Sequence, residues 1–359
     1  MKIFLIVDSL GGGGAERVSS IWSKYWTNNG NEVTFVIISK GNELFNIDKN
    51  IKKIYLPSLS PYFFKNINRI WHLRKIFKRE KPDLLISLTT GPNLLSIVAN
   101  FFLKIRLIIT EHTFPPMEPL SIFKRILKKY LSFFCSEVIV LTEDSKKWFE
   151  NNCYAKKIRI IHNPIEVPIP SSDPLLRVPK KDSKIILNCG RLSYEKGHDL
   201  LIESFKFLAD DFPDWKLFIL GEGKERTTLE NIISDYGLSK RIFLPGWAGN
   251  LDEWYKYADI FAFSSRFEGF GNALAEAKMY GIPCVSFNCT SGPKEIINDG
   301  FDGFLVKPEN HVDMANSLKA LMENPKLREE ISNNAISSGD KFSVSTIMRK
   351  WDNAIQSKD

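Results

Sequence analysis

Hydrophobic positions at the start of the chain alternate with helical patterns in the manner of a layered α/β protein. Residues 2–10 form a nearly continuous apolar run, which is typical of a parallel strand covered on both faces. The glycines at 11–14 indicate a turn, and residues 15–30 have the pattern of a helix that Gly30 closes. Further strands are predicted at residues 32–39, 83–88, 106–111 and 137–142. This alternation favours a doubly wound layer.

The same alternation restarts after a segment rich in Pro and Ser. Later strands are predicted at residues 184–190, 216–221, 241–246, 259–265 and 283–288. We therefore expect two Rossmann-like domains that face each other across a cleft, where ligands usually bind. The predicted boundaries are an N-terminal, acceptor-side domain at 1–163, a linker at 164–183, a C-terminal donor-side domain at 184–340 and a terminal helix at 341–359 that packs back on the first domain.

Composition narrows the class of protein. The 359 residues are 43% hydrophobic and 25% charged, which is ordinary for a globular protein. The five cysteines form no Cys-x-x-Cys pair, so a disulfide framework or zinc site is not expected and a reducing cytoplasm fits better. The start of the chain lacks the cleavage site of a signal peptide. The longest apolar runs reach about half of the ~20 residues that a membrane-spanning helix needs.

The glycine-rich turn at residues 11–14 follows a strand and opens a helix, where backbone N–H groups can meet a phosphate or a sugar. A dinucleotide fingerprint would require a third glycine at the place that Glu16 occupies. A nicotinamide cofactor is therefore disfavoured. A tight turn without a ligand remains an alternative.

Charged residues gather after two strands of the second half. Arg191 and Lys196 follow strand 184–190, where a parallel sheet places its site, and two such cations can hold a diphosphate. Glu268 lies in a glycine-rich loop and Glu276 in the helix that follows, near free N–H groups at 270–273. Carboxylates there suit sugar hydroxyls. The alternatives are two ordinary surface cations and a Glu276 exposed on its helix.

A metal is not expected. The sequence contains no Asp-x-Asp motif, Asp210 and Asp211 are adjacent rather than spaced, and the five histidines are scattered. We therefore expect cations and helix dipoles to neutralise phosphate charge, with no metal or other cofactor.

Together, several motifs make the chain similar to a known family. They are GGAER (13–17), Asn163-Pro164, GRLSYEKG (190–197), LGEG (220–223), FLPG (243–246), EGFGNALAEA (268–277) and SGPKEIINDGFDGFLV (291–306). The chain resembles the retaining GT-B-fold glycosyltransferases of bacterial polysaccharide and lipid-linked oligosaccharide synthesis, the glycosyltransferase family 4-like or group 1 enzymes. The resemblance covers nearly the whole chain.

The resemblance implies a role for each matching residue. Arg191 and Lys196 would bind the donor diphosphate and stabilise charge on the departing phosphate, with Glu268 beside the donor sugar and Glu276 on the ribose hydroxyls. His112 would lie near the reacting sugar, although a loop histidine without catalytic duty is the alternative. The remaining donor contacts would come from Gly13, Gly14, Gly221, Phe243, Gly246, Phe270, Gly271 and Asn272.

The implied reaction transfers a hexose or N-acetylhexosamine from a UDP-sugar to a polyprenyl-diphosphate-linked saccharide, with retention. Preplaced cations stabilise charge that develops on the leaving diphosphate in the transition state. An inverting transferase of the same fold and an inactive nucleotide-sugar-binding protein are the alternatives.

The net charge of +7 is unevenly distributed, because residues 61–134 hold thirteen Lys or Arg and four Asp or Glu. Within 119–134, apolar residues repeat at helical spacing and Lys124, Arg125, Lys128 and Lys129 occupy an adjoining face. This pattern predicts peripheral attachment to the anionic cytoplasmic face of the inner membrane, near the acceptor. A helix that packs within its domain is the alternative. No nucleic-acid motif accompanies the basic residues, so nucleic acid is not an expected partner.

Overall fold

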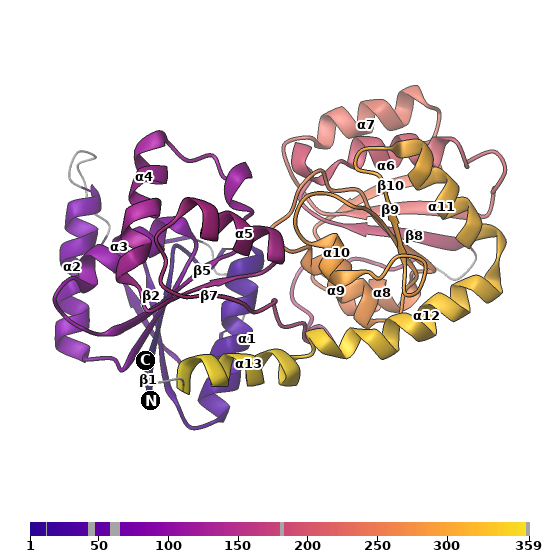
Figure 1. Cartoon of the computed structure of the whole chain (residues 1–359). Helices are drawn as coiled ribbons and strands as arrows, with labels where there is room; N and C mark the ends of the chain where they lie inside the picture. The colour runs from indigo at the N-terminus through magenta and orange to yellow at the C-terminus, as the bar shows by residue number, and fades with distance from the viewer. Residues whose placement is uncertain (12, 42–46, 58–64, 180–182, 357–359) are drawn as a thin grey trace. The chain divides into compact units, whose positions relative to one another are not determined.

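The computed structural model describes residues 1–11, 13–41, 47–57, 65–179 and 183–356. The chain divides into two compact units. Unit 1 comprises Met1–Pro164 and Val344–Asp359, and unit 2 comprises Ile165–Ser343. The boundary between the units at Pro164 and Ile165 thus lies at the start of the predicted linker 164–183, and the rest of that linker belongs to unit 2. Figure 1 shows that each unit has a central sheet with helices packed against it.

Unit 1 contains a seven-stranded parallel sheet in the order β3-β2-β1-β4-β5-β6-β7. Its strands are β1 (Lys2–Val7), β2 (Glu32–Ile37), β3 (Lys52–Tyr55), β4 (Leu84–Leu88), β5 (Arg106–Glu111), β6 (Glu137–Val140) and β7 (Ile158–Ile160). Its helices are α1 (Gly14–Asn28), α2 (Lys65–Glu80), α3 (Thr90–Asn100), α4 (Ile122–Leu131), α5 (Glu143–Asn152) and α13 (Val344–Gln356).

The apolar run of β1 is continuous because both faces of its sheet are buried, as the sequence predicts. Alternate residues of a strand point to opposite faces of its sheet. Ile3 and Leu5 join a core with residues of α1 and α13, whereas Phe4 and Ile6 join a second core with residues of α2, α3 and α5. Both faces of the sheet are therefore covered, as parallel sheets require.

Unit 2 contains a six-stranded parallel sheet in the order β10-β9-β8-β11-β12-β13. Its strands are β8 (Lys184–Cys189), β9 (Trp215–Leu220), β10 (Ile242–Gly246), β11 (Ile260–Phe263), β12 (Cys284–Phe287) and β13 (Phe304–Val306). Its helices are α6 (His198–Lys206), α7 (Arg226–Asp235), α8 (Leu251–Tyr257), α9 (Asn272–Met279), α10 (Pro293–Ile296), α11 (His311–Glu323) and α12 (Pro325–Gly339). The two sheets confirm the predicted doubly wound α/β class.

The terminal helix α13 is part of unit 1, which confirms the prediction that the chain ends on its first domain. The Trp351 ring lies 4.5 Å from that of Trp22 and 5.7 Å from that of Trp26. The Arg106 guanidinium donates to the carbonyl oxygens of Ala354 and Ile355 at 2.7 and 2.6 Å. Aromatic packing and the hydrogen bonds from Arg106 together attach α13 to the unit. Figure 1 shows α13 beside α1.

Three strands, β3, β7 and β13, are absent from the sequence prediction. All three lie at a sheet edge and have only three or four residues. An edge strand is covered less than a central one, so it lacks the continuous apolar run that identifies β1 or β4. Within the described part of the chain, no helix is long and apolar enough to cross a membrane.

Candidate functional site

The loops after β8, β9 and β10 pack directly against one another. The Gly221 backbone N–H donates to the carbonyl oxygen of Gly246 at 2.8 Å. A Cβ atom built on Gly221 would overlap the carbonyl oxygen of Gly190, and one built on Gly223 would overlap that of Leu192. Gly221 also has a φ of 142°, which L side chains rarely adopt. These glycines therefore let three strand ends meet at one edge of the sheet.

The turn that carries Lys196 is fixed against the carboxyl end of β11. The turn is a 3-10 helix at Tyr194–Lys196, and Gly197 follows in the left-handed conformation with φ of 59°. A Cβ atom on Gly197 would overlap the Ser264 carbonyl oxygen, and the Ser264 hydroxyl donates to the Lys196 carbonyl oxygen at 2.9 Å. The loops after β8 and β11 therefore form one rigid edge.

Lys196 and Glu268 form an ion pair at this edge, with Lys196 Nζ 2.5 Å from Glu268 Oε1. The Ser265 hydroxyl donates to the same oxygen at 2.7 Å. The side chains are 24% and 11% exposed, so both can be reached by a ligand. Arg191, in the loop after β8, is exposed. The structure therefore brings Lys196 and Glu268 together and leaves Arg191 accessible beside their loop.

A glycine-rich loop and a second loop from β12 pack together ahead of α9. A Cβ atom on Gly292 would overlap the Phe270 carbonyl oxygen, and the Ser291 hydroxyl donates to the Gly269 carbonyl oxygen at 3.3 Å. Ser291 has a φ of 65°, a conformation that costs a non-glycine residue free energy. Gly271, with φ of 101°, then starts α9 at Asn272. The predicted residues 268–272 and the segment 291–295 thus meet at one place.

Glu276 is buried, with 4% of its surface exposed, so the alternative of an exposed position on its helix is wrong. The Tyr255 hydroxyl, from α8, donates to Glu276 Oε2 at 2.9 Å. Sequence reasoning did not identify Tyr255. Its contact with Glu276 joins residues 21 positions apart on different helices, and no periodicity within either helix indicates it.

His198 is a second residue that sequence reasoning did not assign to this edge. It is buried at the start of α6, and its Nε2–H donates to the Arg191 carbonyl oxygen at 3.1 Å. Burial lowers the pKa of His198 to about 4. The ring is therefore neutral near pH 7 and supports the backbone of the loop that presents Arg191.

The predicted residues of unit 1 lie at the carboxyl ends of two of its strands. Gly13 and Gly14 follow β1 and begin α1, while Gly12 lies outside the described residues. His112 follows β5, with Nε2 3.0 Å from the Thr110 hydroxyl and its ring 5.9 Å from that of Trp22. Burial lowers the pKa of His112 to about 4. A neutral imidazole at this position is suited to hydrogen bonding rather than to ion pairing.

Lys128 does not belong to the exposed basic face predicted for α4. It is 4% exposed, and its ammonium lies 2.9 Å from Glu111 and 3.1 Å from Glu118. The helical period turns position 128 toward α3 and β5, where the two carboxylates compensate its charge. Lys124 and Arg125 are exposed and Lys129 is half-buried. The prediction for Lys128 is therefore wrong.

The outer surface of α4 is apolar as well as basic. Four large side chains of this helix are exposed, namely Ile122, Phe123, Ile126 and Tyr130. Phe133 and Phe134, which directly follow the helix, are exposed too. We call these six residues with Lys124, Arg125 and Lys129 the α4 surface. At the start of the basic region 61–134, residues 61–64 lie outside the described residues, and residues 65–80 form α2.

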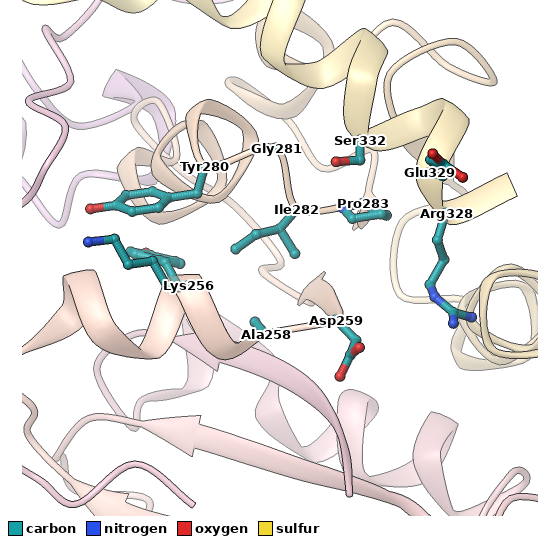
Figure 2. Close-up of a pocket in the computed structure, with 11 residues that line it drawn as sticks. Lys256, Ala258, Asp259, Tyr280, Gly281, Ile282, Pro283, Arg328, Glu329 and Ser332 are labelled. Atoms are coloured by element: carbon teal, nitrogen blue, oxygen red, sulfur yellow. The ribbon is translucent and has the colours of Figure 1, made fainter. Parts of the chain in front are cut away.

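A hollow of about 400 Å³ lies at the amino ends of strands of the unit 2 sheet, opposite to the carboxyl ends described above (Figure 2). Its lining includes Asp259 and Pro283, which directly precede β11 and β12. The hollow is thus at the amino ends of these strands, away from Lys196 and Glu268. Asp259 pairs with Lys184 at 3.0 Å, and Arg328 donates to the Met322 carbonyl oxygen at 3.1 Å. The hollow contains none of the predicted site residues, so we assign it no role in the site.

Among the residues that the structure describes, no cluster of three or more His, Cys, Asp or Glu is placed to hold a metal ion.

Comparison with known proteins gives two family matches, one in the first half of the chain and one in the second. Residues 12–167 match the model described as Glycosyltransferase Family 4, and residues 177–338 match the one described as Glycosyl transferases group 1. The GGAER motif (13–17) falls inside the first range, and the segments 190–197 and 268–277 fall inside the second.

Two curated relatives match over nearly their full length. The chain is 29% identical to the N-acetylgalactosamine-N,N'-diacetylbacillosaminyl-diphospho-undecaprenol 4-alpha-N-acetylgalactosaminyltransferase of Campylobacter jejuni, over 97% of each chain. It is 27% identical to the amylovoran biosynthesis glycosyltransferase AmsD of Erwinia amylovora, over 99% of each chain. These relatives are similar in length as well as in sequence.

Solved structures share the fold. HepE of Anabaena in complex with UDP-glucose has a TM-score of 0.84 at 20% identity, and the match covers 100% of both chains. TarM of S. aureus has a TM-score of 0.80 at 16% identity, covering 99% of this chain and 100% of TarM. At these identities the likeness concerns the fold.

Proposed function

Because the chain belongs to the GT-B glycosyltransferases of bacterial polysaccharide biosynthesis, we propose that it transfers a hexose or N-acetylhexosamine from a UDP-sugar, with retention, to a lipid-linked saccharide. The ion pair of Lys196 with Glu268 beside the exposed Arg191 is the observation that carries the proposal. The diphospho-undecaprenol compound in the name of the Campylobacter relative supports the acceptor class. The UDP-glucose in the HepE complex supports the donor class.

The chemistry of donor cleavage accounts for the cations. When the bond between the anomeric carbon and the β-phosphate oxygen breaks, positive charge develops on the sugar and negative charge on the leaving diphosphate. Arg191 and Lys196 would stabilise the diphosphate more in the transition state than in the ground state, which lowers the barrier. Glu268 would accept hydrogen bonds from the donor sugar. Donor binding would thus separate the present ion pair, with Lys196 turning to phosphate.

Retention is proposed to follow from attack on the face that the diphosphate leaves. The leaving phosphate oxygen takes the proton of the acceptor hydroxyl, so no side chain is needed as a base. Glu276 would bind the ribose hydroxyls, and Phe243–Gly246 would frame the base. We propose that no metal takes part, because two side-chain cations and the start of α9 can neutralise the diphosphate.

The test of the proposed reaction is UDP release from UDP-glucose, UDP-galactose, UDP-GlcNAc and UDP-GalNAc, with bacterial membrane extract as acceptor. Lys196→Ala should lower kcat by roughly a hundred- to a thousandfold, the usual loss for one charge-stabilising group. Lys326→Ala, an exposed lysine on α12, is the matched control and should keep the wild-type rate. Unchanged turnover of Lys196→Ala would refute the proposed role.

The same assay separates the finer parts of the proposal. Activity should persist in EDTA, and its loss would show that a metal is required. The NMR coupling constant at the product's anomeric carbon should show the same anomeric configuration as in the donor sugar. An inverted product would favour the inverting alternative, and no turnover with any donor would favour an inactive binding protein.

We further propose that the α4 surface attaches the protein to the cytoplasmic face of the inner membrane, where a polyprenyl-linked acceptor would be reached. Exposed Ile122, Phe123 and Ile126 can enter the lipid headgroup region, while neighbouring cations approach anionic lipids. Each Lys or Arg near such a surface contributes about 1 kcal/mol.

Flotation with vesicles that contain phosphatidylglycerol tests this attachment. The wild-type protein should float, and the floating fraction should fall as salt is raised. A double variant, Phe123→Ser with Ile126→Ser, should stay at the bottom of the gradient. Wild-type protein that does not float, or floats equally with neutral vesicles, would contradict the proposal.

A further inference from the structure

The carboxylate of Glu276 is held by a residue from a neighbouring helix. Glu276 lies on α9 and is almost wholly buried, and the Tyr255 hydroxyl on α8 donates to its Oε2 at 2.9 Å. A glutamate side chain has three rotatable bonds, and fixing them costs up to about 2 kcal/mol of conformational entropy. A hydrogen bond made before ligand arrives removes part of that cost from the binding step.

Tyr255 is itself rigidly placed. It is 1% exposed, and its ring stacks on that of Tyr280 with centroids 5.1 Å apart and an angle of 26° between the planes. On another side it lies 5.9 Å from the Phe261 ring of β11. The Tyr255 ring therefore cannot rotate without disturbing this packing, and the packing holds its hydroxyl at Glu276.

The stacked partner Tyr280 uses its hydroxyl differently. It donates to Asp252 Oδ1 at 2.5 Å and accepts the Ile169 backbone N–H at 3.0 Å. Burial and the Asp252 carboxylate raise the pKa of Tyr280. Tyr280, labelled in Figure 2, thus joins α8 to the segment that begins unit 2, and its hydroxyl does not contact Glu276 in these hydrogen bonds. The two rings share one stack, but their hydroxyls have separate partners.

We propose that Tyr255 is a positioning residue: its hydroxyl orients the Glu276 carboxylate toward the ribose of the donor and so sets the preference for ribonucleotides over 2′-deoxyribonucleotides. The inference rests on the proposed function, in which Glu276 binds the ribose hydroxyls. It extends that function by naming the group that makes the carboxylate selective.

Hydrogen-bond geometry explains why positioning affects this preference. A hydrogen bond between a hydroxyl and a carboxylate weakens steeply as its angle departs from linearity. Without the Tyr255 hydroxyl, Glu276 can adopt other rotamers, and a bond to the 2′-hydroxyl would form in only part of them. UDP would then lose affinity, whereas 2′-deoxy-UDP, which keeps only the 3′-hydroxyl, would lose less.

Calorimetric titration of the full-length protein with UDP and with 2′-deoxy-UDP tests the inference. The unaltered protein should bind UDP roughly ten- to a hundredfold more tightly, the range for a hydrogen bond to a charged group. Tyr255→Phe should bring the ratio of the two dissociation constants to about threefold or less. Tyr280→Phe removes the matched hydroxyl of the stacked ring and should keep the wild-type ratio, whatever its effect on the melting temperature.

A second variant keeps the test decisive if Tyr255→Phe does not fold. Glu276→Asp shortens the side chain by one methylene, so that one carboxylate cannot meet both the Tyr255 hydroxyl and the ribose, and its ratio should fall as far. Donor kinetics should show a raised KM with a smaller change in kcat for both variants.

The outcomes separate the two proposals. If the unaltered protein binds no UDP, the proposed donor class fails and the inference fails with it. If it prefers UDP but Tyr255→Phe keeps the full ratio, the positioning role alone is overturned. If Glu276→Asp keeps the full ratio, the ribose-binding role of Glu276 in the proposed function is overturned, and the positioning role with it. An equal loss in Tyr280→Phe would also overturn it, because the stack rather than the Tyr255 hydroxyl would then be responsible.

Discussion

Lys128 carries the ammonium of a buried polar cluster in unit 1. Glu111 and Glu118 lie within 3.1 Å of it, and the Thr90 hydroxyl accepts a hydrogen bond from it at 2.9 Å. Burial raises the pKa of Glu111, an effect that the ammonium opposes. Burial alone lowers the pKa of Lys128, but the two carboxylates raise it above its ordinary value. The cluster therefore depends on the cation that two carboxylates share.

Removing that cation should destabilise unit 1. Lys128→Met leaves the buried Glu111 and the half-buried Glu118 without their ammonium, and we expect the free energy of unfolding to fall by about 3–5 kcal/mol. Lys129, the next residue, is half-buried and pairs with no carboxylate in the described part of the chain. Lys129→Met should therefore change the free energy of unfolding by about 0.5 kcal/mol or less. Urea denaturation measures both. Equal effects of the two variants would show that the cluster does not stabilise the unit.

At the scale of elements, the site in unit 2 depends on how closely the loops after its strands approach each other. Gly221→Ala should disrupt this edge, because the new methyl group would overlap the Gly190 carbonyl oxygen and the backbone φ of 142° is strained for alanine. Gly237 also has positive φ, of 69°, but nothing lies within 4 Å of its added Cβ. The two glycines thus separate backbone strain from close packing.

We expect Gly237→Ala to lower the free energy of unfolding by about 1 kcal/mol and to keep nucleotide affinity. Gly221→Ala should cost more than that and should weaken UDP binding at least tenfold, on the order expected for a displaced loop. Thermal melts and titration with UDP measure the two effects. Wild-type UDP affinity in Gly221→Ala would show that the close packing does not shape the site.

Most of the central strands, and helices such as α9, could be predicted from the sequence. Central strands such as β1, β5 and β8 were located by their apolar runs, and α9 was recognised from residues that favour helix after a glycine-rich loop. The edge strands β3, β7 and β13 were missed because partial cover leaves no continuous apolar run. The helical period of α4 was recognised, but which side of the helix faces inward was assigned wrongly at Lys128.

At the scale of the whole molecule, the chain returns to unit 1 after completing unit 2. Trp351 on α13 is fully buried against Trp22 and Trp26. Trp351→Ala should therefore lower the stability of unit 1 by about 3–5 kcal/mol, the usual cost of removing a buried aromatic ring. Trp71→Ala, in the same unit but 56% exposed, should have little effect.

Scanning calorimetry tests this dependence, since two separate cores can unfold in separate transitions. Only the transition of unit 1 should move to lower temperature in Trp351→Ala. If both transitions shift equally, α13 stabilises the molecule as a whole rather than the unit with which it packs.

Some features of the site depend on residues close together in the sequence, and others on contacts between distant residues. The motifs at 190–197 and 268–276 were read from their residue types, because cations after one strand and carboxylates near the start of a helix are local patterns. The ion pair between Lys196 and Glu268 joins residues 72 positions apart and required the sheet to bring two strand ends together. The roles of these residues, and that of His112, stay predictions.

The sequence by itself determined the α/β class, the order of the central strands along the chain and the residue types available for anion and sugar binding. These properties follow from apolar periodicity and from motifs within a few residues of one another. Only the tertiary structure decided that Lys128 is buried, that Lys196 pairs with Glu268 and that Tyr255 holds Glu276. Each of these depends on contacts between distant segments, and the pattern within one element does not specify which partner covers it.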